Sequence, residues 1–265
     1  MPQFTAVTPE FFANKSWQQP STYAFAAQAN VLPVIAAELA KLVPRMPLGF
    51  VQTEAGFQLV AIASLQPDSN FFIAPDGRWL GDYVPAVLRS YPFRLVKLQD
   101  RDESILCFDE SSGSALGAGI GEAFFDAAGT PGAMVNRMLD LVSQIERSRV
   151  ATQAAVDALQ AAGLIQPWPL NMQQGDQTIP VEGLYCIDEA ALLAVQDDAF
   201  LTLRKAGALP LAYAQLLSMS QLDKLQQAFF EQSKLKTLAR QASNHTTSLT
   251  DLGFKFSDGE TLHFQ

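Results

Sequence analysis

The chain has 265 residues, of which 48% are hydrophobic, enough to bury the core of one large domain or of two modest, closely joined ones. Acidic residues (27) outnumber basic residues (18), so the formal net charge is -9. A broad basic surface for nucleic acid is therefore missing from the composition. These numbers predict a soluble globular protein that does not bind nucleic acid.

The N-terminal sequence and the cysteines bear on where the protein resides. Residues 1–17, MPQFTAVTPEFFANKSW, lack the basic segment and apolar run of a signal peptide. No stretch approaches the roughly 18 uncharged apolar residues of a membrane helix. The two cysteines, Cys107 and Cys186, lie in apolar, strand-like runs, where buried free thiols are expected rather than a disulfide. We therefore expect a cytoplasmic protein without a membrane span.

The N-terminal half is predicted to be rich in strands. Residues 31–43 carry apolar side chains at helical spacing and are expected to form an amphipathic helix. A short helix is also expected over residues 82–90, with Asp82 as its N-cap. Strand patterns separated by turn sequences occupy residues 48–53, 57–65, 70–74, 93–98 and 104–109. This order predicts an antiparallel sheet of at least five strands.

The second half is predicted to be mainly helical. Residues 111–131 are rich in Gly and Ala, with one short strand expected at 122–126. A long helix is expected over 134–162, ending at a glycine C-cap, Gly163. A strand is expected over 178–187, helices over 189–195, 197–206, 209–218 and 221–242, and a terminal hairpin over 254–264.

Together these elements predict the α+β class, with a mostly antiparallel sheet in the N-terminal half, packed with helices, and a helix-rich C-terminal third. The sequence contains no internal repeat and no low-complexity linker. We therefore expect a single co-folded domain over residues 1–265. The alternative is a division into a sheet-rich part, 1–130, and a helix-rich part, 131–265.

Few residues are suited to metal or nucleophilic chemistry. The two histidines, His245 and His263, stand near the C-terminus without Cys or carboxylate residues at the spacing of a metal site. A Ser or Cys nucleophile would depend on one of them as its base, and Ser114 in GSALG does not fit the G-x-S-x-G turn. The sequence therefore predicts no metal site and no histidine-based triad.

Glycines and acidic pairs also have simple structural interpretations. Gly113, Gly117, Gly119 and Gly121 lack the G-x-G-x-x-G spacing of a dinucleotide-binding turn, so a loop and no cofactor are expected. Acidic pairs at 109–110, 188–189 and 197–198 stand at the ends of predicted elements. Carboxylates in such positions cap helices or solvate the ends of strands.

Residues 71–93, FFIAPDGRWLGDYVPAVLRSYPF, form the most distinctive segment, with six aromatic residues, three prolines and two arginines. Trp and Tyr combine a large contact area with a polar tip, and Arg stacks on aromatic rings or binds carboxylates. The candidate binding residues are therefore Trp79, Tyr83, Arg89 and Tyr91, and a peptide or protein is the expected partner.

The same side chains also admit a structural interpretation. They could form a buried aromatic corner in which Arg89 pairs with Asp82 or Asp109. In that case the segment would join a turn, a short helix and the sheet. The sequence alone leaves both interpretations open.

This segment also resembles a family signature. GRWLGDYVPAVLRSYPF is similar to the pattern G-x-W-x-x-x-Y-(V/I)-P-A-x-(L/I)-R-x-Y-P-F of SapC-like bacterial proteins. Further similar stretches are VLPVIAAEL, Pro-Leu-Gly-Phe, ILCFDESS and IDEAALLAVQDDAFLTLRKAGALPLAYAQLLSMSQLDKL. The resemblance covers most of residues 20–230. It implies an accessory role near surface-layer export or assembly, with no established catalytic residues to carry over.

Three functional hypotheses follow. The preferred one is a non-catalytic binding or accessory protein that recognises a peptide or protein, so that enzymatic activity is not favoured. The first alternative is an enzyme acting on a peptide or small metabolite in a pocket near Trp79, Asp82 and Arg89; it requires a concave pocket with a carboxylate of raised pKa. The second alternative is a structural component associated with the surface layer. The sequence does not determine the oligomeric state.

Overall fold

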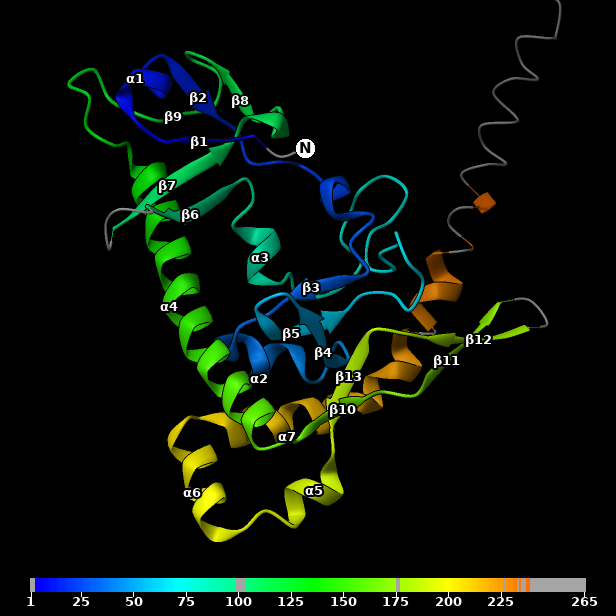
Figure 1. Cartoon of the computed structure of the whole chain (residues 1–265). Helices are drawn as coiled ribbons and strands as arrows, with labels where there is room; N and C mark the ends of the chain where they lie inside the picture. Colours follow the sequence, from blue (N-terminus) through cyan, green and yellow to red (C-terminus); the bar gives the residue numbers. More distant parts are fainter. Residues whose placement is uncertain are drawn as a thin grey trace, which may run out of the picture.

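The computed structural model describes residues 3–98, 103–174, 177–225, 227–232, 234 and 237–238. Within these residues the chain has the predicted α+β fold (Figure 1). Antiparallel sheets dominate the N-terminal half, and the C-terminal part is rich in helices. The predicted hairpin at 254–264 and both histidines, His245 and His263, lie outside the described residues.

A five-stranded antiparallel sheet forms the centre of the molecule. Its strands are, in spatial order, β10 (Ile165–Pro167), β13 (Leu184–Ile187), β4 (Leu48–Thr53), β5 (Gly56–Ile62) and β3 (Val31–Pro33). In the β4–β5 hairpin, Leu48 is opposite Ala61 and Thr53 is opposite Gly56. Gly56 has a φ of 116°, which side-chain-bearing residues rarely adopt. The predicted strands at 48–53 and 57–65 are confirmed, although the second ends at Ile62.

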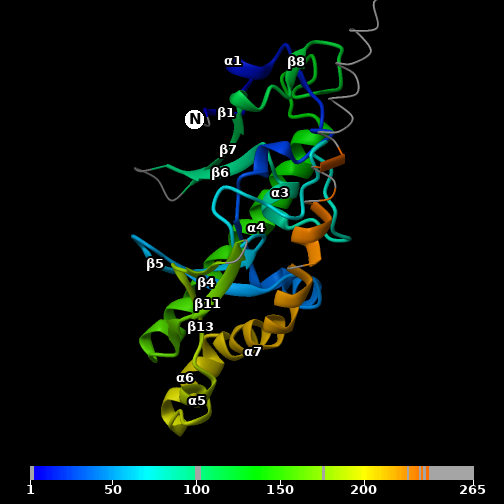
Figure 2. The same cartoon turned by 90° about the vertical axis from the view of Figure 1, so that its right-hand side faces the viewer.

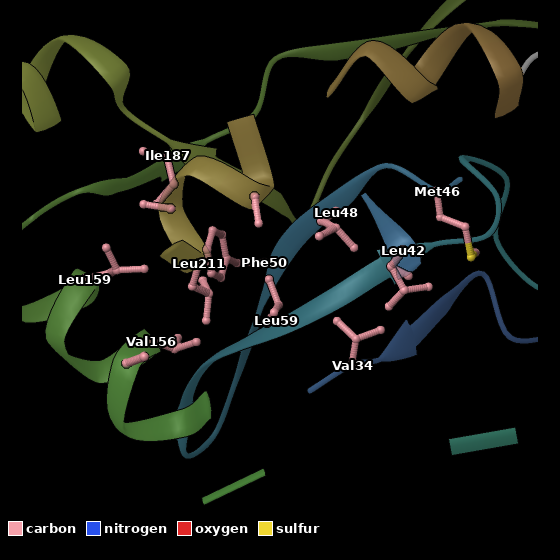
Figure 3. Close-up of a cluster of buried hydrophobic side chains, with 14 of the residues drawn as sticks. Val34, Leu42, Met46, Leu48, Phe50, Leu59, Val156, Leu159, Ile187 and Leu211 are labelled. Carbon is pink, nitrogen blue, oxygen red and sulfur yellow. The ribbon is translucent and has the colours of Figure 1, made fainter. Parts of the chain in front are cut away.

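Two helices pack against this sheet and against each other: α4 (Ala133–Ala161) and α7 (Ala208–Ser218). Figure 3 shows Val156 and Leu159 of α4 approaching Leu211 of α7 and Phe50 of the sheet. Burying an aliphatic or aromatic side chain of this size contributes about 1.5–3 kcal/mol. The apolar periodicity that predicted both helices is thus explained by this shared core.

A second core lies at the other end of α4. It rests on a three-stranded sheet with the order β1 (Phe4–Ala6), β7 (Ser104–Asp109) and β6 (Phe93–Lys97). Phe93 and Phe108 of this sheet meet Phe12 and Phe124, and the ring centroids of Phe93 and Phe108 are 5.0 Å apart. Met134 and Met138 of α4 pack against these rings. Because α4 contributes to both cores, it joins the two sheets along its length (Figure 1).

Shorter elements complete the chain. The N-terminal ones are α1 (Pro9–Phe12), β2 (Lys15–Trp17), η1 (Ala24–Ala26), η2 (Ala36–Glu38), α2 (Leu39–Leu42) and α3 (Ala86–Arg89). The later ones are η3 (Glu110–Ser112), β8 (Ala115–Gly117), β9 (Glu122–Ala123), β11 (Leu170–Gln174), β12 (Gln177–Val181) and η4 (Met219–Gln221). Strands β8, β2 and β9 form a small sheet, and β11 pairs with β12. The strand expected at 122–126 is therefore present but shorter.

The helix predicted over 31–43 is wrong in its first part. The segment begins with edge strand β3, in which Val31 is opposite Ile62, and only then enters η2 and α2. Pro33 has no backbone N–H to donate, which a strand at the edge of a sheet tolerates. Pairing with β5 therefore overrides the local helical pattern. As a consequence, Glu38 lies at the end of η2 and is buried.

Three further predictions need correction. Residues 70–74 form no strand; a single bridge joins Ile73 to Trp79, because the chain turns back at the Pro-Asp-Gly sequence. The helix expected over 82–90 is limited to α3, because Pro85 occupies the N-cap position instead of Asp82. The strand expected over 178–187 is two strands, β12 and β13, separated by a turn at Gly183, whose φ is 80°.

The C-terminal helices α5 (Glu189–Leu193) and α6 (Asp197–Lys205) confirm the predictions for this region. With α7 they gather at one end of the molecule (Figure 2). Asp188 caps α5, since its carboxylate accepts a hydrogen bond from the backbone N–H of Ala191 at 2.9 Å. None of the helices in the described residues combines the length and apolar character needed to cross a bilayer.

Candidate functional site

Trp79 is held by two aromatic contacts and by a hydrogen bond at its polar tip. Its indole stacks on Phe72, with ring centroids 5.4 Å apart, and meets Tyr23 edge-on at 6.1 Å. Indole Nε1 donates a hydrogen bond to the backbone carbonyl of Tyr83 at 2.9 Å. A Cβ atom on Gly81 would stand 2.8 Å from this nitrogen, so the loop closes tightly around the ring only with glycine there. The side chain is half-buried and thus pre-positioned.

Tyr83 and Arg89 are tied to a residue that the sequence did not single out, Glu38. The Tyr83 hydroxyl donates to Glu38 Oε1 at 2.7 Å, and the backbone N–H of Ala86 donates to the same oxygen at 2.6 Å. Burial, followed by the bond to Glu38, raises the pKa of Tyr83. The Arg89 guanidinium donates to the Tyr83 hydroxyl at 3.3 Å and lies 3.9 Å from Glu38 Oε1. Glu38 therefore anchors the start of α3.

The partners proposed for Arg89, Asp82 and Asp109, are wrong. Arg89 instead lies beside Glu38, and its Nε donates to the carbonyl of Val84. Asp109 belongs to β7, where it accepts hydrogen bonds from Gln3 and Ser111. Glu38 was missed because one acidic residue in a helix-like stretch is normally solvent-exposed. The available signal was the neighbouring apolar run VLPVI, which places the following residues against a core.

Asp82 pairs with Arg45, the residue just before Met46-Pro47. Arg45 Nε donates to Asp82 Oδ1 at 2.7 Å, and this hydrogen bond lowers the pKa of Asp82. A second cation, Lys224, lies beside them, and its amine donates to the carbonyl of Pro44 at 3.0 Å. Two cations and one carboxylate therefore meet at this edge, although the chain as a whole is acidic.

These groups surround a half-open cavity of about 260 Å³, which we call the Trp79 pocket. Its lining includes Phe72, Trp79, Tyr83, Arg45, Asp82 and Lys224. The volume is slightly below the usual range of small-molecule sites, about 300–1,000 Å³. Aromatic surface beside two cations suits a ligand that presents an apolar group next to an anionic one. Such an arrangement can bind and orient a ligand.

Tyr91 does not line the Trp79 pocket. Its ring stacks on Phe25, with centroids 3.9 Å apart, and its hydroxyl lies 3.5 Å from Asp109 Oδ2. Burial, followed by the charge of Asp109, raises the pKa of Tyr91. Tyr23 connects the two regions, because its ring contacts both Phe25 and Trp79. Of the four predicted residues, Trp79 and Tyr83 line the pocket, whereas Arg89 lies over the Tyr83 ring and does not line it.

The cysteines, the possible metal ligands and the glycine-rich segment can also be compared with the structure. Cys107 and Cys186 are free and buried, as predicted, and burial raises the pKa of both thiols. Among the described residues, no three His, Cys, Asp or Glu side chains gather closely enough to hold a metal ion. Gly113 follows η3 in the left-handed conformation, with a φ of 67°, and ends that turn.

The fold is α+β, and the cavity beside Trp79 is lined by aromatic and cationic side chains. Residues 8–225 match the family model described as SapC. The chain therefore belongs to the SapC family, as the signature in residues 77–93 predicted. No curated protein and no solved structure matches the chain.

Proposed function

We propose that this protein is a non-catalytic binding or accessory protein that recognises a peptide or protein partner in the Trp79 pocket. The observation that carries this proposal is the pocket itself, in which internal hydrogen bonds already orient Trp79 and Tyr83. A pre-positioned aromatic side chain loses little conformational freedom on binding. Aromatic anchors of this kind supply much of the binding energy at protein interfaces.

The charges of the pocket indicate which peptide it takes. Arg45 and Lys224 outnumber Asp82, so the pocket carries a local positive charge on an acidic protein. The matching ligand has an acidic side chain or terminal carboxylate beside an aromatic or aliphatic residue. Charge-assisted hydrogen bonds to Lys224 would fix the carboxylate, and stacking would hold the apolar group.

Binding is favoured over catalysis by the state of Asp82. A general base works best when its pKa is near the operating pH. The hydrogen bond from Arg45 lowers the pKa of Asp82, which moves it further away from neutral pH. The Asp82 side chain is also 71% exposed. Arg89, the other residue of the enzyme alternative, does not line the pocket. The free cysteines are consistent with a reducing compartment, so we include a cytoplasmic location in this proposal, to be checked by cell fractionation.

Calorimetric titration with two blocked dipeptides tests the proposal. N-acetyl-Asp-Phe-amide should bind, and N-acetyl-Lys-Phe-amide should bind far more weakly, because it places a cation beside Arg45 and Lys224. Lys224→Ala should weaken binding of the acidic peptide about tenfold, whereas Lys205→Ala, an exposed lysine on α6, should not. Trp79→Ala should remove binding. Equal affinity for both peptides, or for wild type and Lys224→Ala, would overturn the proposal.

A further inference from the structure

Glu38 has one carboxylate oxygen that no described residue satisfies. Oε1 accepts hydrogen bonds from Tyr83 and Ala86, but Oε2 is buried without a hydrogen-bond partner in the part of the chain that the structure describes. Only 4% of the Glu38 side chain is exposed to solvent. A buried carboxylate oxygen left unpaired is energetically costly, so most such groups in folded proteins have a partner.

Glu38 lines a second cavity, which we call the Glu38 cavity. It has a volume of about 110 Å³ and lies between α4, α3 and strand β5. Most of the lining is apolar, with contributions from Val34, Leu59, Val87 and Ile145. The cavity thus combines an apolar wall with one unsatisfied anionic acceptor.

Three other polar side chains of the Glu38 cavity already have partners, and Gln58 also lines it. Thr152 Oγ1 accepts from the backbone N–H of Ala36 at 2.8 Å and donates to a carbonyl of its own helix. Gln153 Nε2 donates to the carbonyl of Phe57 and to Asp157. Arg149 makes two hydrogen bonds of 2.7 Å to Glu146, so its charge is compensated. Glu38 Oε2 is the buried carboxylate oxygen of this cavity that is left without a partner within the described part of the chain, so it is the acceptor offered to a cationic ligand.

We propose that the Glu38 cavity is a second binding site, for a small primary ammonium group on a short alkyl chain. The ammonium would donate a charge-assisted hydrogen bond to Glu38 Oε2, and the chain would lie against Val87 and Ile145. An apolar cavity of about 150 Å³ holds a benzene molecule, so this smaller one has room for roughly three or four carbons. This site does not depend on the proposed role of the Trp79 pocket.

Titration of the full chain with n-butylammonium chloride tests this proposal, with n-butanol as the neutral probe of the same shape. Because charge-assisted bonds are about twice as strong as neutral ones, butylammonium should bind at least about tenfold more tightly than butanol. Glu38→Gln keeps the Oε1 acceptor for Tyr83 and Ala86 and replaces only the anionic oxygen. This variant should lose the preference for the cation.

A steric variant keeps the test decisive if Glu38→Gln unfolds. Ile145→Phe should fill the cavity and abolish butylammonium binding while Glu38 remains in place. Val150→Phe is the matched control, because Val150 lies on the same helix and is 57% exposed. Equal binding of the two probes, unchanged binding to Ile145→Phe, or no binding of butylammonium to the wild-type chain would each overturn the proposal.

Discussion

The Trp79 pocket and the Glu38 cavity arrange charge in opposite ways. In the pocket, Arg45 and Asp82 are paired at an exposed edge, where water screens them and the pair adds little to stability. In the cavity, the carboxylate of Glu38 is buried and holds the start of α3. One residue, Tyr83, lines the first and donates to the anion of the second. The exposed pair can therefore be removed at little cost to stability, whereas Glu38 holds α3 through Oε1 and keeps Oε2 without a partner among the described residues.

The strongest test of this contrast is Glu38→Ala. The substitution leaves the backbone N–H of Ala86 and the hydroxyl of Tyr83 without their acceptor, each of which costs about 1–3 kcal/mol. We expect a loss of roughly 2–4 kcal/mol in the free energy of unfolding, measured by urea denaturation. Glu38→Gln should lose clearly less. If the two variants are equally stable, Glu38 Oε1 is not the anchor of α3.

A smaller effect is expected from separating Tyr91 from its stacked partner. Phe25→Ala removes the ring that lies 3.9 Å from Tyr91, and aromatic pairs contribute about 0.5–1.5 kcal/mol beyond the area that they bury. The loss of unfolding free energy should therefore be at least about 1 kcal/mol, because the buried area of the ring is lost as well. Binding of the acidic dipeptide should not change, since neither ring lines the Trp79 pocket. Weaker binding would show that Tyr91 belongs to the recognition surface after all.

The smallest effect on stability is expected at Asp82. The pKa of Asp82 is lowered in the folded chain, so its contribution is present above the ordinary value of 3.8 and is lost as the pH falls through the folded value. Asp82→Asn should change stability little at neutral pH, and its stability should depend less on pH below about 4. Thermal unfolding between pH 2 and pH 7 measures this difference.

Asp82→Asn also tests whether the acidic dipeptide binds in the Trp79 pocket. Asp82→Asn removes the carboxylate that lines the pocket beside Arg45 and Lys224, so binding of the acidic dipeptide should strengthen about two- to fivefold. Asp76→Asn is the matched control: the pKa of Asp76 is likewise lowered by a neighbouring arginine, Arg78, but Asp76 does not line the pocket. Equal effects of the two substitutions would argue for a general charge effect.

Periodic segments were predicted most successfully from the sequence. The strands at 48–53, 93–98 and 104–109 and the helix over 134–162 are present within about one residue of the predicted bounds. The two strands at 48–53 and 104–109 each bury a run of consecutive residues, whereas the helix buries residues spaced along one stripe. The segment at 31–43 was misread because its apolar residues fit a helix as well as an edge strand. Only the presence of β5 alongside decides between these two structures.

By itself, the amino-acid sequence determined the α+β class and the family, and it singled out Trp79 and Tyr83, which both line the Trp79 pocket. These depend on local periodicity and on a contiguous motif. The tertiary structure alone decided the roles of Glu38, Arg45 and Lys224, which lie 45, 37 and 142 positions away from the motif residues Tyr83 and Asp82. The sequence around a charged residue does not reveal its partner, because the interaction depends on the distance between the two charges in the folded chain.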